Sequence, residues 1–149
     1  MKSFENKVAA ITGAGSGIGR ALALGLARQG CHVALSDVNS AGLKETAELV
    51  RKLGVKASEA LVNVADRDAV QAWADQVMAE YGQVNAIFNN AGVAQGGTVE
   101  GNDYADYEWV MSINFWGVVN GTKAFLPYLK STGEGHIVNT SSIFGLFAQ

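Results

Sequence analysis

Residues 8–19 read V-A-A-I-T-G-A-G-S-G-I-G, an apolar run followed by a cluster of glycines. The apolar run Val8–Ile11 has the length and composition of a buried parallel strand. The segment after the glycines, residues 20–29, has the pattern of a helix that ends at Gly30. A strand, a glycine turn and a helix form the layout of a phosphate-binding site. Glycines allow positive φ and close approach of the anion, and the helix N-terminus offers free N–H groups.

Strand and helix signals alternate along the rest of the chain. Strands are expected at about residues 7–11, 32–37, 55–64, 85–88 and 136–140, and further helices at about 41–53, 67–81 and 103–130. Asn39 or Ser40 can cap the first of these helices, Asp66 the second, and Asp103 with Asp106 the third, in which Pro127 should bend or loosen a turn. The alternation predicts an α/β fold with a doubly wound parallel sheet in three layers. Ligands of such sheets bind at the carboxyl ends of the strands.

Composition excludes several classes of function. Hydrophobic residues make up 48% of the 149 residues and charged residues 17%, which is typical of a soluble globular domain. The net charge of −3 gives no basic surface for nucleic acid, and no apolar run is long enough for a membrane helix. Cys31 is the only cysteine, so we expect no disulfide and no metal cluster, a cytoplasmic location, and a core position for Cys31. Trp73, Trp109 and Trp116 lie on helical faces and are also expected in the core.

Three more motifs follow the glycine turn. They are N-N-A-G at residues 89–92, S-I-N-F at 112–115 and N-T-S-S at 139–142. In this order, and with T-G-x-x-x-G-x-G at residues 12–19, they resemble the short-chain dehydrogenase/reductase family over almost the whole chain. The resemblance implies a single NAD(P)-binding domain of Rossmann type over residues 1–149, with the strand order 3-2-1-4-5. It also implies an oxidoreductase that transfers a hydride between nicotinamide and a secondary alcohol or ketone.

The resemblance, together with the chemistry of the side chains, gives a set of candidate site residues. Those expected to bind the cofactor are Thr12, Gly13, Ser16, Gly17, Ile18, Gly19, Asp37, Asn63, Val64, Asn90, Ala91 and Gly92. Thr12 has a structural alternative, which is to hold the glycine turn, and Asn63 stands where family members often carry aspartate. Ser142 is expected to donate a hydrogen bond to the substrate oxygen, on which negative charge grows. Asn114 is expected to hold a water for proton relay, with a plain core asparagine as the alternative.

Asp37 bears on the choice of cofactor. It stands about 20 residues after the glycine turn, where a carboxylate can accept hydrogen bonds from the adenosine ribose and repel a 2′-phosphate. No Lys or Arg occurs at positions 36–41, and Ser16 occupies a site where NADP-dependent family members often have a basic residue. NAD(H) is therefore favoured over NADP(H). The alternative is an Asp37 that caps a helix or is only solvated.

The family's general acid/base pair, a Y-x-x-x-K motif beyond the serine, does not occur in this sequence. We therefore expect a domain that is incomplete after the fifth strand and a chain that is inactive alone. The parent enzyme would be a homo-oligomer, a dimer or tetramer, acting on a small alcohol or ketone. The alternative is a non-catalytic dinucleotide-binding module. The loops near the substrate supply a mostly apolar set, Val93, Ala94, Gln95, Phe144, Leu146 and Phe147, which leaves the substrate open.

Overall fold

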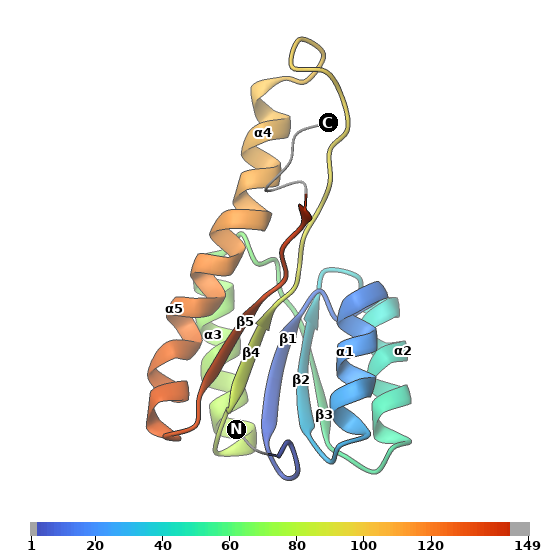
Figure 1. Ribbon diagram of the computed structural model, residues 1–149, viewed down its shortest axis with the longest axis vertical. Helices are drawn as coiled ribbons and strands as arrows, with labels where there is room; N and C mark the ends of the chain where they lie inside the picture. Colours follow the sequence, from blue (N-terminus) through green and yellow to red (C-terminus); the bar gives the residue numbers. More distant parts are fainter. Residues whose placement is uncertain (1–2, 144–149) are drawn as a thin grey trace.

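The computed structural model describes residues 3–143 and contains one parallel sheet of five strands. The strands are β1 (Val8–Thr12), β2 (His32–Asp37), β3 (Ala57–Leu61), β4 (Ala86–Asn89) and β5 (His136–Asn139). Their order is β3-β2-β1-β4-β5, and every neighbouring pair is parallel (Figure 1). The predicted order is confirmed.

Helices cover both faces of the sheet (Figure 1). One face carries α1 (Gly17–Ala27) and α2 (Ser40–Arg51), and the other carries α3 (Arg67–Tyr81) and α5 (Gly117–Ser131). Helix α4 (Tyr104–Met111) continues through a wide π-helical turn, η1 (Ser112–Trp116), into α5. The fold is therefore the expected three-layer, doubly wound arrangement.

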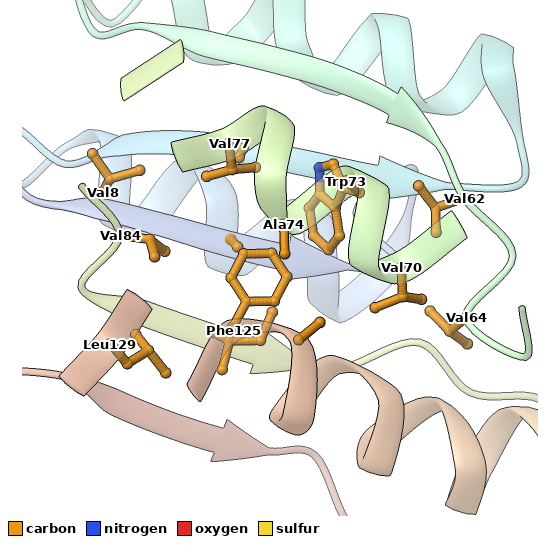
Figure 2. Packing of buried hydrophobic residues seen from close by; sticks show 14 residues of the cluster. Val8, Val62, Val64, Val70, Trp73, Ala74, Val77, Val84, Phe125 and Leu129 are labelled. Carbon is orange, nitrogen blue, oxygen red and sulfur yellow. The ribbon is translucent and has the colours of Figure 1, made fainter. Parts of the chain in front are cut away.

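Each face of the sheet has its own hydrophobic core. Leu35, Leu43 and Val50 are buried between the sheet and the α1–α2 layer. On the other face, side chains of α3 and α5 point toward one another above the strands (Figure 2). There the rings of Trp73 and Phe125 pack edge to face, with centroids 5.0 Å apart. Burial on both faces explains why β1 is apolar from Val8 to Ile11.

The expectation that all three tryptophans lie in the core is right for Trp73 and wrong for the other two. Trp109 is 45% exposed and Trp116 is 54% exposed. Helix α4 extends beyond the sheet (Figure 1) and has no buried residue, so its side chains have no sheet surface to pack against.

Capping side chains set the helix boundaries where the sequence predicts. Asn39 caps α2, its Oδ1 accepting from the Gly42 N–H at 3.1 Å. Asp66 caps α3, and Asp103 and Asp106 form the reciprocal capping box of α4. Two features differ from the prediction. Strand β3 is shorter than residues 55–64. The irregular turn expected at Pro127 lies instead at Ser112–Trp116, and α5 continues through Pro127.

Because all five strands run in the same direction, their carboxyl ends meet at one edge of the sheet. Thr12 ends β1, Asp37 ends β2, and Asn89 and Asn139 end β4 and β5 at paired positions. The connections after β1 and β4 leave toward opposite faces. This is the switch point at which doubly wound sheets bind ligands.

Candidate functional site

A cleft of about 510 Å³ opens at this switch point. It is lined by Gly13, Ser16, Gly17, Ile18, Asp37, Val38, Val62, Asn63, Val64, Asn90, Ala91, Gly92, Val93, Ile113 and Thr140. Ten of these are predicted site residues, drawn from the ends of β1, β2, β3 and β4. Thr12, Gly19, Asn114 and Ser142 are not among them.

The floor of the cleft is the glycine turn between β1 and α1. Gly13 and Gly17 have φ of 65° and 51°, a region that side chains disfavour. A Cβ at Gly13 would lie 2.8 Å from Ala91 Cα, whereas one at Gly17 would meet no heavy atom within 4 Å. The Ser16 side chain makes no capping hydrogen bond to α1 within the described part of the chain. The start of α1 thus presents N–H groups to an open space.

Thr12 lies beneath the cleft rather than in it. It is 2% exposed, and its hydroxyl oxygen accepts from the N–H groups of Asn90 and Ala91, both at 2.9 Å. The hydroxyl donates to the Phe88 carbonyl at 3.3 Å. Thr12 therefore fixes the two turns that follow β1 and β4 to each other. This contact agrees with the structural alternative for Thr12, in which it holds the glycine turn instead of contacting the cofactor.

Asn90 strengthens the same junction. Its Nδ2 donates to the Thr12 carbonyl at 3.1 Å and more weakly to the Gly13 carbonyl at 3.4 Å. Its Oδ1 accepts from the Thr140 hydroxyl at 3.1 Å. One side chain thus connects the loops after β1, β4 and β5.

Asp37 lines the cleft with its carboxylate held by two backbone donors. Oδ2 accepts from the Gly15 N–H at 2.8 Å, and Oδ1 accepts from the Asn39 N–H at 2.9 Å. Asn39, not Asp37, is the cap of α2. Each carboxylate oxygen has a second lone pair, so the group can still accept hydrogen bonds from a ligand.

Asn63 and Val64 follow β3 and line the cleft at the wall next to the end of β2. Asn63 Oδ1 accepts from the Ala65 N–H at 3.0 Å and shapes the local turn. Val64 is buried, and its carbonyl accepts from Asn120 Nδ2 of α5 at 2.9 Å. Val64 makes its part of this wall apolar, and α5 holds its backbone in place.

The two predicted catalytic residues are placed differently. The Asn114 side chain, in the η1 turn, pairs with the backbone of Val93, which lines the cleft. Ser142 is exposed, two residues beyond the lining residue Thr140. Phe144, Leu146 and Phe147 fall outside the described residues.

Several residues of the site have no sequence motif that identifies them. Val38, Val62 and Ile113 line the cleft but are ordinary apolar residues in sequence. Gly15 stands at a variable position of the T-G-x-x-x-G-x-G motif, although its N–H donates to Asp37. A Cβ at Gly15 would lie 2.9 Å from Asp37 Oδ2, so the carboxylate occupies the space that a side chain would fill.

Residues 3–143 contain neither a metal-binding cluster nor a membrane-spanning helix. No three His, Cys, Asp or Glu side chains in this range are placed to hold a metal ion. Over the same range, no helix combines the length and hydrophobicity needed to cross a bilayer.

Comparison with known proteins gives consistent matches. The family described as short chain dehydrogenase matches residues 7–149. SadH of Mycobacterium tuberculosis, named as an oxidoreductase, is 53% identical over 148 residues, which are 99% of this chain and 54% of SadH. A short-chain dehydrogenase/reductase of Burkholderia phymatum, solved in complex with NAD, superposes with a TM-score of 0.96 at 39% identity over 100% of this chain and 53% of its own. An NAD⁺-bound xylitol dehydrogenase gives 0.93 at 36% identity over 99% of this chain and 57% of its own.

The chain thus spans about half the length of the curated relatives it matches. The matched region contains the whole sheet and every predicted motif. This chain belongs to the short-chain dehydrogenase/reductase family.

Proposed function

We propose that this chain is the NAD(H)-binding part of an oxidoreductase that interconverts a secondary alcohol and a ketone. Residues 1–149 would form a single NAD(P)-binding domain, incomplete at its C-terminal end. The observation that carries the proposal is the Asp37 carboxylate, which the Gly15 and Asn39 N–H groups hold at the cleft beside the glycine turn.

The shape of the cleft fits a dinucleotide. The turn at Gly13 and Gly17 leaves the space that a diphosphate needs, and the N-terminus of α1 supplies donors and the positive end of a helix dipole. Asp37 would accept from the ribose hydroxyls, and the apolar wall at Val64 suits an adenine ring, with Asn63 at its edge. Asn90, Ala91 and Gly92 would lie along the other half of the cofactor. When bound, the nicotinamide would carry the hydride.

NAD(H) is proposed over NADP(H) on electrostatic grounds. A 2′-phosphate would bring a second negative charge close to Asp37. Positions 36–41 contain no Lys or Arg to compensate it, and Ser16 is neutral. The NAD complexes of the Burkholderia protein and of xylitol dehydrogenase support a dinucleotide at this site.

Ser142 is proposed to donate a hydrogen bond to the substrate oxygen as negative charge grows there. For Asn114 we propose a positioning function instead of the water-holding one expected from sequence. Both polar atoms of its side chain are engaged by Val93, so the asparagine fixes the segment beside the cleft.

The test is binding of NADH and NADPH to the purified protein, followed by tryptophan fluorescence or calorimetry. We expect NADH to bind more tightly than NADPH. The difference between the two affinities should be smaller in the Asp37→Ala variant. Because hydrogen bonds to a charged group contribute about 1.5–3 kcal/mol, NADH affinity should fall roughly 10- to 100-fold.

Asp68→Ala is the matched control, since it removes an exposed carboxylate from α3 outside the cleft. It should leave both affinities unchanged. Equal affinity of the wild type for the two cofactors, or a ratio that Asp37→Ala does not change, would overturn the proposal.

A further inference from the structure

Both backbone groups of Gly15 are held by side chains. Its N–H donates to Asp37 Oδ2 at 2.8 Å, and its carbonyl accepts from Arg20 Nη2 at 2.7 Å. The donor to the proposed selectivity carboxylate is therefore fixed by a side chain that does not line the cleft.

Arg20 connects the glycine turn to the second helix. Its Nε donates to Thr46 Oγ1 at 2.9 Å, and Nη2 also reaches the Glu45 carboxylate at 2.7 Å. The Arg20 side chain is only 25% exposed. A guanidinium is planar and presents several donors in fixed directions, so these contacts fix its orientation in a way that a lysine ammonium could not reproduce.

Two glycines allow this close arrangement. A Cβ at Gly42, in the first turn of α2, would lie 2.6 Å from the Gly15 carbonyl oxygen. A Cβ at Gly15 would lie 2.9 Å from Asp37 Oδ2. The start of α2 thus rests on the glycine turn, and the Asn39 N–H of the same helix start holds the other carboxylate oxygen at 2.9 Å.

We propose that Arg20 is a positioning residue for cofactor selection. It holds the Gly15 carbonyl and so fixes the backbone of Gly15, whose N–H holds the Asp37 carboxylate in the orientation that accepts an unphosphorylated ribose. The proposal rests on the proposed function and extends it, because selectivity then depends on the whole contact between α1, the glycine turn and α2. The competing explanation is a simple charge effect, in which Arg20 attracts the diphosphate of either cofactor from a distance.

The experiment compares Arg20→Met and Arg20→Lys with wild type, measuring the dissociation constants of NADH and NADPH at low and high salt. A positioning residue needs the guanidinium geometry, so both variants should lose about tenfold in NADH affinity and little in NADPH affinity. The double variant with Asp37→Ala should bind NADH about as well as Asp37→Ala alone, since both changes remove the same interaction. Arg28→Met, which removes an exposed charge at the other end of the same helix, should change nothing.

A charge effect would look different. Arg20→Lys would then bind like wild type, and Arg20→Met would lose affinity for both cofactors equally, with a larger loss at low salt than at high salt. That pattern would overturn the inference. Unchanged affinities in both Arg20 variants would also overturn it, and so would losses of NADH affinity that are fully additive with the loss in Asp37→Ala. Should Arg20→Met fail to fold by circular dichroism, Thr46→Val removes one acceptor of the guanidinium, together with the hydrogen bond that the Thr46 hydroxyl donates to the Gly42 carbonyl within α2. Thr46→Val should reduce the preference for NADH over NADPH by less than Arg20→Met would. An unchanged ratio of the two dissociation constants would contradict the inference.

The two proposals fail separately. If Asp37→Ala leaves the ratio unchanged, the proposed cofactor selection is wrong regardless of Arg20. If Asp37→Ala narrows the ratio and the Arg20 variants do not, only the positioning inference is wrong.

Discussion

The side-chain amide of Asn114 pairs with the backbone of Val93 through two hydrogen bonds of 2.8 Å. Oδ1 accepts from the Val93 N–H, and Nδ2 donates to the Val93 carbonyl. Asn114 lies in the wide η1 turn, and Val93 lies in the segment that follows β4 and lines the cleft. The pair therefore fixes a cleft wall to the α4–α5 helix, which compensates for the low helix propensity of asparagine.

Replacing Asn114 by Leu should loosen this wall. The Val93 N–H and carbonyl would lose their partners, and we expect a loss of about 1–3 kcal/mol in unfolding free energy and weaker NADH binding. Urea denaturation and cofactor titration measure the two effects. Ser112→Ala in the same turn is the control, because its hydroxyl donates only to the Trp109 carbonyl. An Asn114→Leu variant with wild-type stability and affinity would show that the pairing contributes nothing.

Gly19 and Gly25 give a matched pair within α1. A Cβ at Gly19 would overlap the Gly13 carbonyl oxygen, whereas a Cβ at Gly25 would meet no heavy atom within 4 Å. Gly25→Ala should stabilise the protein by about 0.5–1 kcal/mol, since alanine favours the helix. Gly19→Ala gains the same propensity but forces the glycine turn to move, which should cost about 1–3 kcal/mol and most of the NADH affinity.

Thermal or urea unfolding of the two alanine variants, with NADH titration, decides this prediction. Because both variants make the same chemical change in the same helix, helix propensity cancels in their difference. Equal stabilities and equal affinities would mean that helix and turn are not in close contact.

The features that could be predicted from sequence share one property. In each of them, the residue whose type and position led to the prediction is also the residue that makes the contact. Asp66 and Asp103 cap helices through neighbours in sequence, and Asp37 is the last residue of its strand. The parallel sheet follows from the alternation of short apolar strands with helices, and its strand order from the family resemblance.

The features that were missed depend on partners far apart in sequence. Arg20 is an ordinary helix residue until the packing of α1 on α2 places it between the Gly15 carbonyl and Thr46. Trp109 has the spacing of a core residue, but its helix extends beyond the sheet. The contact of Asn114 with Val93 could not be predicted for the same reason, since no local pattern relates the two residues.

Thr12 should tolerate serine but not valine. Its hydroxyl oxygen is the acceptor for two buried N–H groups, those of Asn90 and Ala91. Valine has nearly the same shape without the oxygen, so Thr12→Val should cost roughly 2 kcal/mol or more in unfolding free energy. Thr12→Ser keeps the acceptor and should lose much less, about the value of one buried methyl group, near 1 kcal/mol.

Urea denaturation of the two variants, followed by tryptophan fluorescence, tests this prediction. NADH affinity should follow the same order, because the junction of the turns after β1 and β4 forms the cleft. If Thr12→Val were as stable as Thr12→Ser, the hydroxyl would not hold the junction.

Cys31 should be an inert thiol in the native protein. It is fully buried, and burial raises the pKa of the Cys31 thiol to about 12. Only about one native thiol in ten thousand would be ionised at pH 8, so reaction with Ellman's reagent should need unfolding. Thiol release in buffer and in concentrated urea measures this. Rapid reaction of the native protein would contradict the core position.

The same raised pKa predicts a dependence of stability on pH. In the unfolded chain the Cys31 thiol ionises near its ordinary pKa of 9.0, whereas in the native protein it stays neutral up to about pH 12. Its contribution is therefore complete below about pH 9 and is lost as the pH rises from about 9 to 12. Between pH 8 and pH 10, wild type should lose about 1–2 kcal/mol more unfolding free energy than Cys31→Ala does. Taking the difference between the two proteins removes the titration of tyrosines and lysines, so identical pH profiles would mean that the native thiol ionises as easily as the unfolded one.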